Sequence, residues 1–339
     1  MPMLVRHDAA IATDQVRYAQ SIVFRGLEDD PGNDDAYQHL VEDVLPAASF
    51  IDLELQDNQF GGLHRYVQST RFETAIAQGT RFAVEYQKMR ESNDPDSAMP
   101  NDPHNEKVTG IALSNHGSFG DTEIAVRRRN EYANVTESQV KHEMTVLPRL
   151  HLQLGLEVNA TADESNDLMV FGMRDQVSTG LLYDFSKRDY FNVEPSWARY
   201  YSQTGDFLGS GNTLSMELGH QIRTEYPNWK VRVIGIHTNF NPVANAMLPL
   251  PDNMNIYGVC FGTGELNRRV YSYAWRPYVD GCATNNDLSG QGYNAMLGLA
   301  GSVVGRDQLS LTLSQVRGGA NLVNGLIREF KLNYRYFID

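Results

Sequence analysis

A hydrophobic period of two runs through most of this 339-residue chain and constrains its fold more than any other feature. It is clearest in Leu150–Val158, where every second residue is apolar and the residues between are polar or glycine. The same alternation recurs in Ile51–Leu55, Phe82–Tyr86, Leu214–Leu218, Leu309–Leu313 and Phe330–Tyr334. Each of these segments is expected to form a β-strand with one apolar and one polar face.

The breaks between these segments alternate in length. Short breaks are expected near residues 78–79, 116–117, 148, 186–187, 227–228, 264 and 305–306. Longer breaks are expected near residues 58–62, 91–106, 130–137, 160–166, 203–210, 241–253, 279–289 and 317–324. About 16 strands fit between them if Asp167–Phe185 is one long tilted strand. Short turns on one rim and longer loops on the other are typical of a bacterial outer-membrane barrel.

A membrane barrel explains this pattern better than a soluble sheet. For any single strand, an apolar face packed on a soluble core is the more common arrangement. A soluble all-β domain packs two sheets on apolar inner faces, whereas here the second face stays polar over most of the chain. A membrane helix is not expected, because the longest nearly apolar stretch, Ala295–Gly305, is far shorter than the roughly 20 residues needed. We therefore predict an all-β transmembrane fold, a 16-stranded antiparallel outer-membrane β-barrel, over residues 49–339.

Residues 1–48 follow a helical period instead. Apolar residues recur at helical spacing between Val16 and Leu27, and the pattern resumes from Ala36 after the breaking turn Asp30–Asn33. This predicts two helices joined by a tight turn before the barrel. Met1–Leu4 lacks the basic region and apolar core of a secretory signal peptide.

The chain is acidic, with 29 Lys and Arg against 42 Asp and Glu and a formal net charge of −13. Nucleic acid is not an expected partner, because its phosphates need a positive surface. Alternation places seven acids on the polar faces, which line the lumen of a barrel: Asp52, Glu54, Glu85, Glu157, Glu194, Glu217 and Glu329. An acidic passage would concentrate cations and oppose anions. The alternative is that these carboxylates are ordinary lumen residues paired with inward bases such as Lys331 and Arg335.

The sequence carries no complete catalytic or metal-binding motif. His142-Glu143 begins the zinc-protease pattern, but Val146 stands where the second histidine is needed. A Gly-x-Ser-x-Gly segment that would expose a nucleophilic serine is also lacking. Cys260 and Cys282 match no metal-ligand spacing, and we interpret them as two unpaired thiols. We therefore expect no catalytic residue, no cofactor and no metal.

Residues 241–253 form an unusually apolar and proline-rich connection. Such a segment would be an odd surface if it were exposed to water. We hypothesise that it folds into the barrel mouth as a plug, with these plug residues: Met247, Leu248, Pro249, Leu250 and Pro251. The alternative is a loop packed on the outer rim or against a partner.

Several segments together resemble a known family. They are a helical ending with Asp30–Asn33, followed by Tyr273–Tyr278, Gly292-Tyr293 and Gly305–Leu309. The chain resembles the C-terminal porins of exopolysaccharide exporters, in which periplasmic tetratricopeptide repeats precede a 16-stranded barrel. Within that group it is most similar to the PelB family, with the cellulose and poly-N-acetylglucosamine exporters as relatives. Only a short helical remnant of the repeats is present.

The resemblance implies an outer-membrane channel of a Gram-negative bacterium that exports the cationic, partly de-N-acetylated Pel polymer. It also implies a ring of the lipoprotein PelC beneath the barrel, on the periplasmic side, where the helical remnant would lie. The lumen acids and Tyr200 are then candidates for contact with the polymer, since aromatic and carboxylate groups offer weak, repeated contacts. Folded-in loops would gate the passage.

Three alternatives to this function stay open. The first is an outer-membrane β-barrel enzyme, such as a protease or an acyl-modifying protein. The second is a porin for another amino-sugar or cellulose-like polymer. The third is a soluble β-rich binding protein, which would fold without detergent.

Overall fold

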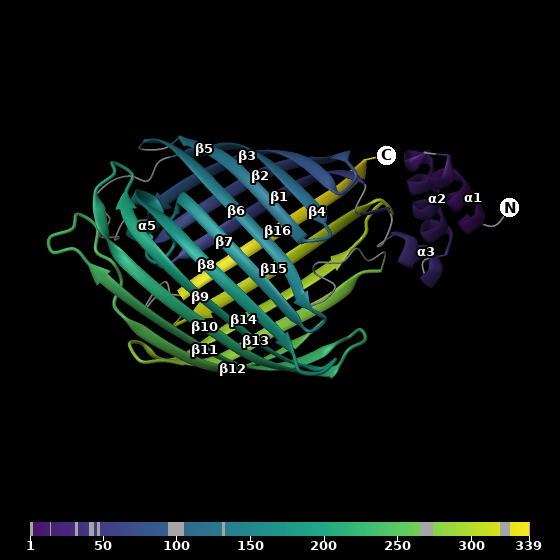
Figure 1. The fold of residues 1–339 in the computed structure, drawn as a ribbon. Helices are drawn as coiled ribbons and strands as arrows, with labels where there is room; N and C mark the ends of the chain where they lie inside the picture. The colour runs from purple at the N-terminus through teal and green to yellow at the C-terminus, as the bar shows by residue number, and fades with distance from the viewer. Residues whose placement is uncertain are drawn as a thin grey trace.

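The computed structural model describes residues 3–13, 15–30, 33–40, 44–45, 48–93, 105–130, 133–264, 274–318 and 326–338. These residues include sixteen antiparallel strands that close into one barrel, with each strand paired to the next and β1 paired to β16. Three helices lie beyond one end of the barrel and a short helix lies at the other (Figure 1). The predicted fold class, a 16-stranded antiparallel β-barrel preceded by helices, is confirmed.

The bounds of the elements follow the chain without crossover. The first eight strands are β1 Ser49–Phe60, β2 Leu63–Ala77, β3 Thr80–Asn93, β4 Glu106–Gly117, β5 Gly120–Asn130, β6 Asn134–Leu147, β7 Leu150–Thr161 and β8 Gly172–Asp184. The second eight are β9 Asp189–Ser202, β10 Phe207–Arg223, β11 Trp229–Pro242, β12 Met254–Thr263, β13 Arg276–Asn286, β14 Gly290–Gly301, β15 Asp307–Arg317 and β16 Leu326–Ile338. The helices are α1 Met3–Ala12, α2 Val16–Asp29, α3 Asp34–His39 and α5 Asn166–Phe171.

The two ends of the barrel differ in their connections. The end where β1 begins and β16 finishes, here called the terminal rim, carries short turns such as 78–79, 118–119 and 148–149. The opposite end, here called the loop rim, carries most of the longer connections, including 162–171 and 243–253. The predicted breaks at 130–137 and 279–289 are too wide, because β6 begins at Asn134 and β13 continues to Asn286.

The predicted strand Asp167–Phe185 is wrong in its first part. Residues 166–171 form α5, and β8 begins only at Gly172. The Ser165 hydroxyl caps this helix by accepting a hydrogen bond from the Leu168 amide at 3.2 Å. Leu168, Met169 and Val170 are all buried, so consecutive side chains find apolar partners, which an alternating strand does not allow. The total of 16 strands is unaffected.

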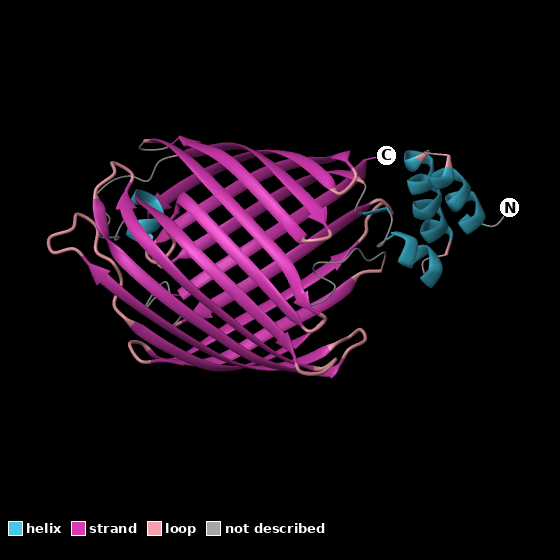
Figure 2. Ribbon diagram, viewed as in Figure 1, coloured by secondary structure: helices cyan, strands magenta, loops and turns pink. Residues whose placement is uncertain are grey.

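Alternation separates two faces of the wall, whose strands Figure 2 shows to be tilted and continuous. Apolar side chains point outward and are exposed, among them Leu53, Ile111, Val259 and Leu297. Polar side chains point inward, where they bond to side chains of neighbouring strands and of strands further round the barrel. None of the described helices is long and apolar enough to cross a membrane.

The interpretation of Cys260 and Cys282 as unpaired thiols is wrong. They form a disulfide between β12 and β13. Strands β12 and β13 pair antiparallel in a register that places the two cysteines, 22 positions apart in sequence, directly opposite each other. A disulfide is consistent with an oxidising compartment outside the cytosol.

The N-terminal helices pack against the terminal rim near the closing strands. Phe24 and Leu27 of α2 join Leu40 in one apolar cluster with Phe50 of β1 and Phe337 of β16. Besides α2 and α3, which overlap the two predicted helices, the structure contains α1, which the sequence reasoning missed. The helices are thus in direct contact with the seam where the barrel closes.

Candidate functional site in the lumen and at its mouth

Strand register places the seven predicted acids on the inward face. Each of them has the opposite strand parity to the exposed apolar residues of its own strand, and the ion pairs of this face can join strands that are not neighbours. Glu85 on β3, for example, lies 2.7 Å from the Arg127 guanidinium on β5. The predicted lumen face is therefore the polar interior of the barrel.

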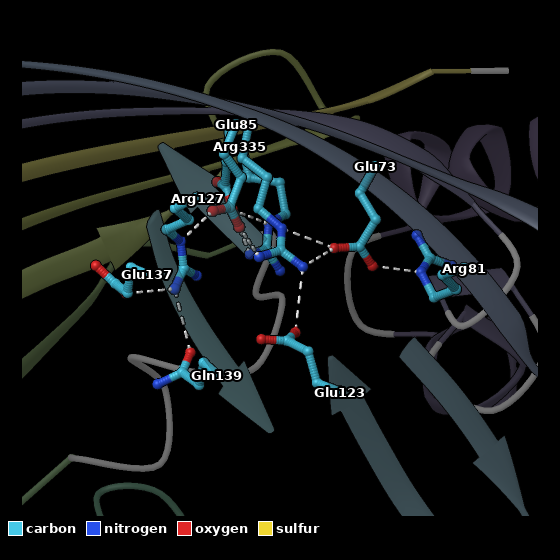
Figure 3. Close-up of polar contacts among 10 residues, drawn as sticks. Glu73, Arg81, Glu85, Glu123, Arg127, Glu137, Gln139 and Arg335 are labelled. Carbon is cyan, nitrogen blue, oxygen red and sulfur yellow. Dashed lines mark hydrogen bonds and ion pairs between the residues drawn. The ribbon is translucent and has the colours of Figure 1, made fainter. Parts of the chain in front are cut away.

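Arg71 of β2 is the centre of a charge network on this face, and Figure 3 shows the network with the acids Glu73, Glu85 and Glu123 labelled. Its guanidinium bonds to Glu73 at 2.8 Å, to Glu85, and to Glu123 of β5 at 3.3 Å. Glu73 also bonds to Arg81, which donates a hydrogen bond to the main-chain oxygen of Ala48 at 2.6 Å. The network thus begins at the terminal rim, where the helices join the barrel.

The network continues along the wall towards the loop rim. Arg127 bonds to Glu137 at 3.1 Å and to the Gln139 amide oxygen at 3.3 Å. The Gln139 amide donates to Glu157 at 2.8 Å, and Glu157 lies 3.5 Å from Arg174 of β8. A polar track therefore extends along the inner wall from β2 to β8.

At the loop rim the track ends in a cluster in which Tyr200 is buried and Asp163 is exposed. Arg174 binds Asp163 and Glu164, the latter at 2.8 Å, and the Tyr200 hydroxyl donates to Glu164 at 2.9 Å. Burial raises the pKa of Glu164 above its usual range, although Arg174 opposes that shift. Tyr200, predicted as a polymer contact, thus lies on the inner wall. Its hydroxyl is already hydrogen-bonded to a carboxylate of the loop.

Helix α5 crosses the barrel mouth. On one side its Asn166 amide donates to the Phe60 oxygen at 2.9 Å, and Met169 and Val170 pack against Leu63 of β2. On the other side the Gln203 side chain, from the turn between β9 and β10, donates to the Val170 oxygen at 2.9 Å. Because β2 and β9 are separated by six strands, α5 spans the opening between distant parts of the wall.

The predicted plug segment lies beside α5 at the same rim. Leu250 is buried in a cluster with Leu168 of α5 and with Tyr200 and Phe240 of the wall. Leu248 packs against that cluster, whereas the Met247 side chain is 80% exposed. Part of the segment therefore packs against α5 and the inner wall.

The remaining predicted acids differ in their partners. Asp52 bonds to Arg335, and Glu54 lies 2.6 Å from Lys331. Glu217 is surrounded by Tyr190, Lys230 and Arg232. Glu194 accepts a hydrogen bond from Asn192, and neither Glu194 nor Glu329 has an ion-pair partner among the described residues.

Four features of the site were not predicted from the sequence: the lumen residues Arg71, Arg127 and Arg174, and helix α5. A signal for Arg71 and Arg127 was available, because each shares the strand parity of an acid on its own strand, Arg71 with Glu73 and Arg127 with Glu123. Among the described residues, the lumen therefore carries a network of paired charges that connects the terminal rim to the loop rim.

Comparison with known families decides what kind of barrel this is. A family model described as PelB, C-terminal beta barrel domain, matches residues 45–337. The chain belongs to the PelB C-terminal β-barrel family. This confirms the predicted family and places the barrel in the outer membrane.

One solved structure shows the same architecture. The PelB-family barrel is similar to a structure titled bacterial polysaccharide outer membrane secretin, with a TM-score of 0.68 and 10% identity over 87% of this chain and 100% of that one. It is also similar to OccK5 (OpdH) of Pseudomonas aeruginosa, with a TM-score of 0.46 and 10% identity over 86% of this chain and 97% of that one. A search of curated proteins found no match.

Proposed function

We propose that this PelB-family barrel is the outer-membrane exit channel for a secreted polysaccharide. The observation that carries the proposal is the polar track from Arg81 at the terminal rim to Tyr200 at the mouth. A sugar chain presents hydroxyl groups at regular intervals, and such a track offers many weak hydrogen bonds that a moving chain can exchange. The similar polysaccharide secretin supports the same substrate class.

The cargo we favour is a cationic amino-sugar polymer of the Pel type. Glu194 and Glu329 lack ion-pair partners among the described residues and so remain available to ammonium groups. The paired acids, including Asp52, Glu54, Glu85, Glu157 and Glu217, can exchange an arginine or lysine partner for an ammonium group in passing. Another amino-sugar or a cellulose-like polymer is the second candidate, since the hydroxyl contacts would serve it equally well.

The orientation follows the usual rule for such barrels, with short turns in the periplasm and longer loops outside. On this proposal the terminal rim and helices α1–α3 are periplasmic, and a lipoprotein ring of the PelC type would dock there. The mouth then faces the cell exterior. Helix α5 and residues 243–253 are the gate that cargo must displace.

Current blockade in a planar bilayer tests this function. Soluble glucosamine oligomers should block the current of the full chain at lower concentration than fully N-acetylated oligomers of the same length. Glu194→Gln with Glu329→Gln should remove most of that difference, because the unpaired carboxylates are gone. Equal blockade by both oligomers would favour the cellulose-like cargo, and no blockade by either would refute a sugar channel.

A further inference from the structure

The part of the outer face that the structure describes carries a concentrated group of cations. Four basic residues share the strand parity of the outward apolar residues on their own strands: Lys88 and Arg90 of β3, Lys107 of β4 and Arg128 of β5. These four residues are here called the basic patch. Three of them are exposed and Lys88 is half-buried. In a chain with a net charge of −13, such a cluster needs an explanation.

Strand pairing holds these cations close together. Lys88 lies directly opposite Lys107 in the register of β3 and β4. Arg128 lies opposite Thr109, so it is a diagonal neighbour of Lys107, at a typical Cα separation of about 7–8 Å. Like charges directly opposite each other destabilise a sheet. None of the four has an ion-pair partner among the described residues.

The height of the basic patch on the wall points to its ligand. Val84, Ile111 and Val126 lie nearer the terminal rim on the same three strands and are 42–53% exposed, as expected for side chains in contact with lipid tails. Tyr86 follows Val84 on the outward face, and Lys88 follows Tyr86. Lys88 lies four positions beyond Val84, which is about 13 Å along a strand. The patch therefore lies just above the apolar band, at the level of lipid headgroups on the loop-rim side.

We propose that the basic patch binds the phosphate groups of a phosphorylated glycolipid, the lipopolysaccharide of the outer leaflet. The acyl chains would lie along the apolar band below, and the phosphates would neutralise the facing lysines. Lysine and arginine side chains reach such headgroups readily from the edge of an apolar zone. This inference rests on the orientation in the proposed function, which makes the loop rim extracellular.

Retention of lipid through purification tests the proposal. The full chain is purified in detergent with a chelator, so that divalent cations do not bridge the phosphates, and bound lipid is counted by native mass spectrometry. Three probes are then offered: bisphosphorylated lipid A, dephosphorylated lipid A and phosphatidylglycerol. The wild-type chain should retain the bisphosphorylated form in preference to the other two.

A matched pair of variants locates the site. Lys88→Gln with Lys107→Gln should lower retention about 30-fold, from about fivefold for each lysine near a phosphate surface. The control, Arg199→Gln with Arg328→Gln, removes two exposed cations elsewhere on the outer face and should retain lipid like the wild type. A shift in gel mobility on boiling confirms that each variant is folded.

Two results would overturn the proposal. One is equal retention by the patch variant and the control variant. The other is a preference of the wild-type chain for phosphatidylglycerol. That result would mean that the loop rim lies on the side of the inner leaflet. Blockade by glucosamine oligomers on the Lys88→Gln, Lys107→Gln variant separates the two proposals, because the outer patch does not line the lumen and blockade should be unchanged.

Discussion

Removing Arg71 tests the charge network at its most connected point. Arg71→Met keeps the side chain long but leaves Glu73, Glu85 and Glu123 without their shared cation. Glu73 and Glu85 each keep a second arginine, whereas no other ion pair of Glu123 occurs among the described residues. The variant should therefore fold but lose stability.

The expected loss follows from exposure. A hydrogen bond to a charged group contributes about 1.5–3 kcal/mol when it is well buried, and an exposed ion pair about 0–1 kcal/mol. The Arg71 side chain is 24% exposed and its three partners are 10–30% exposed, so each contact falls between these limits. About 1 kcal/mol for each contact gives roughly 3 kcal/mol in all.

Urea unfolding in lipid vesicles, followed by tryptophan fluorescence, measures this loss. Arg71→Lys keeps the charge but not the forked geometry, and should lose less than half as much as Arg71→Met. Arg199→Met, on the exposed outer face, should change stability by less than about 0.5 kcal/mol. If Arg71→Met and Arg199→Met unfold at the same urea concentration, the network does not stabilise the wall and this reasoning is wrong.

Three further predictions concern the mouth and the disulfide. Ser165→Ala removes the cap of α5, which should cost about 1 kcal/mol and raise the open fraction of the channel about fivefold in single-channel recordings; an unchanged open fraction would contradict a gating role for α5. The pKa of Glu164 is raised when the mouth is closed, so protonation of Glu164 favours the closed state. This stabilisation of the closed state is complete below the usual carboxyl pKa. It is lost as the pH rises through the raised pKa. Conductance should thus increase from pH 4 to pH 8, and Glu164→Gln should flatten that profile. Cys260→Ser with Cys282→Ser opens a loop of 22 residues and should lower the free energy of unfolding in urea by about 3 kcal/mol. A loss smaller than that caused by a serine substitution on the outward face of a strand would refute a stabilising role for the disulfide.

The strands and the inward acids could be predicted because a period of two assigns every residue of a strand to one face at once. Glu85 and Glu157 were found in this way. The ion pairs were not, since Arg71 contacts Glu123 across 52 residues of sequence and only the closed barrel brings them together. The prediction also counted the inward acids without the arginines and lysines that pair with them. It therefore overstated the negative charge of the lumen.

Two features were missed for different physical reasons. Helix α5 ends in a short apolar run, and over six residues a buried helix and a buried strand have no distinguishable period. Its role in the mouth depends on contacts with Phe60 and Gln203, which are distant in sequence. The disulfide depends on the register of β12 and β13, because a shift of one residue would turn one cysteine outward.

The gate at the mouth is the most direct test of the account as a whole. Leu63→Cys and Met169→Cys, two side chains in one apolar cluster, can be joined by a short reducible crosslinker that fixes α5 to β2. The control pair, Ile51→Cys and Phe72→Cys, lies directly opposite on the outer face of β1 and β2 and cannot obstruct the lumen. The measurement is surface polymer on cells producing the full-length protein, before and after reduction. Crosslinking α5 should stop export and reduction should restore it, with the control pair unaffected; export that continues while α5 is fixed would contradict passage of the polymer through this mouth.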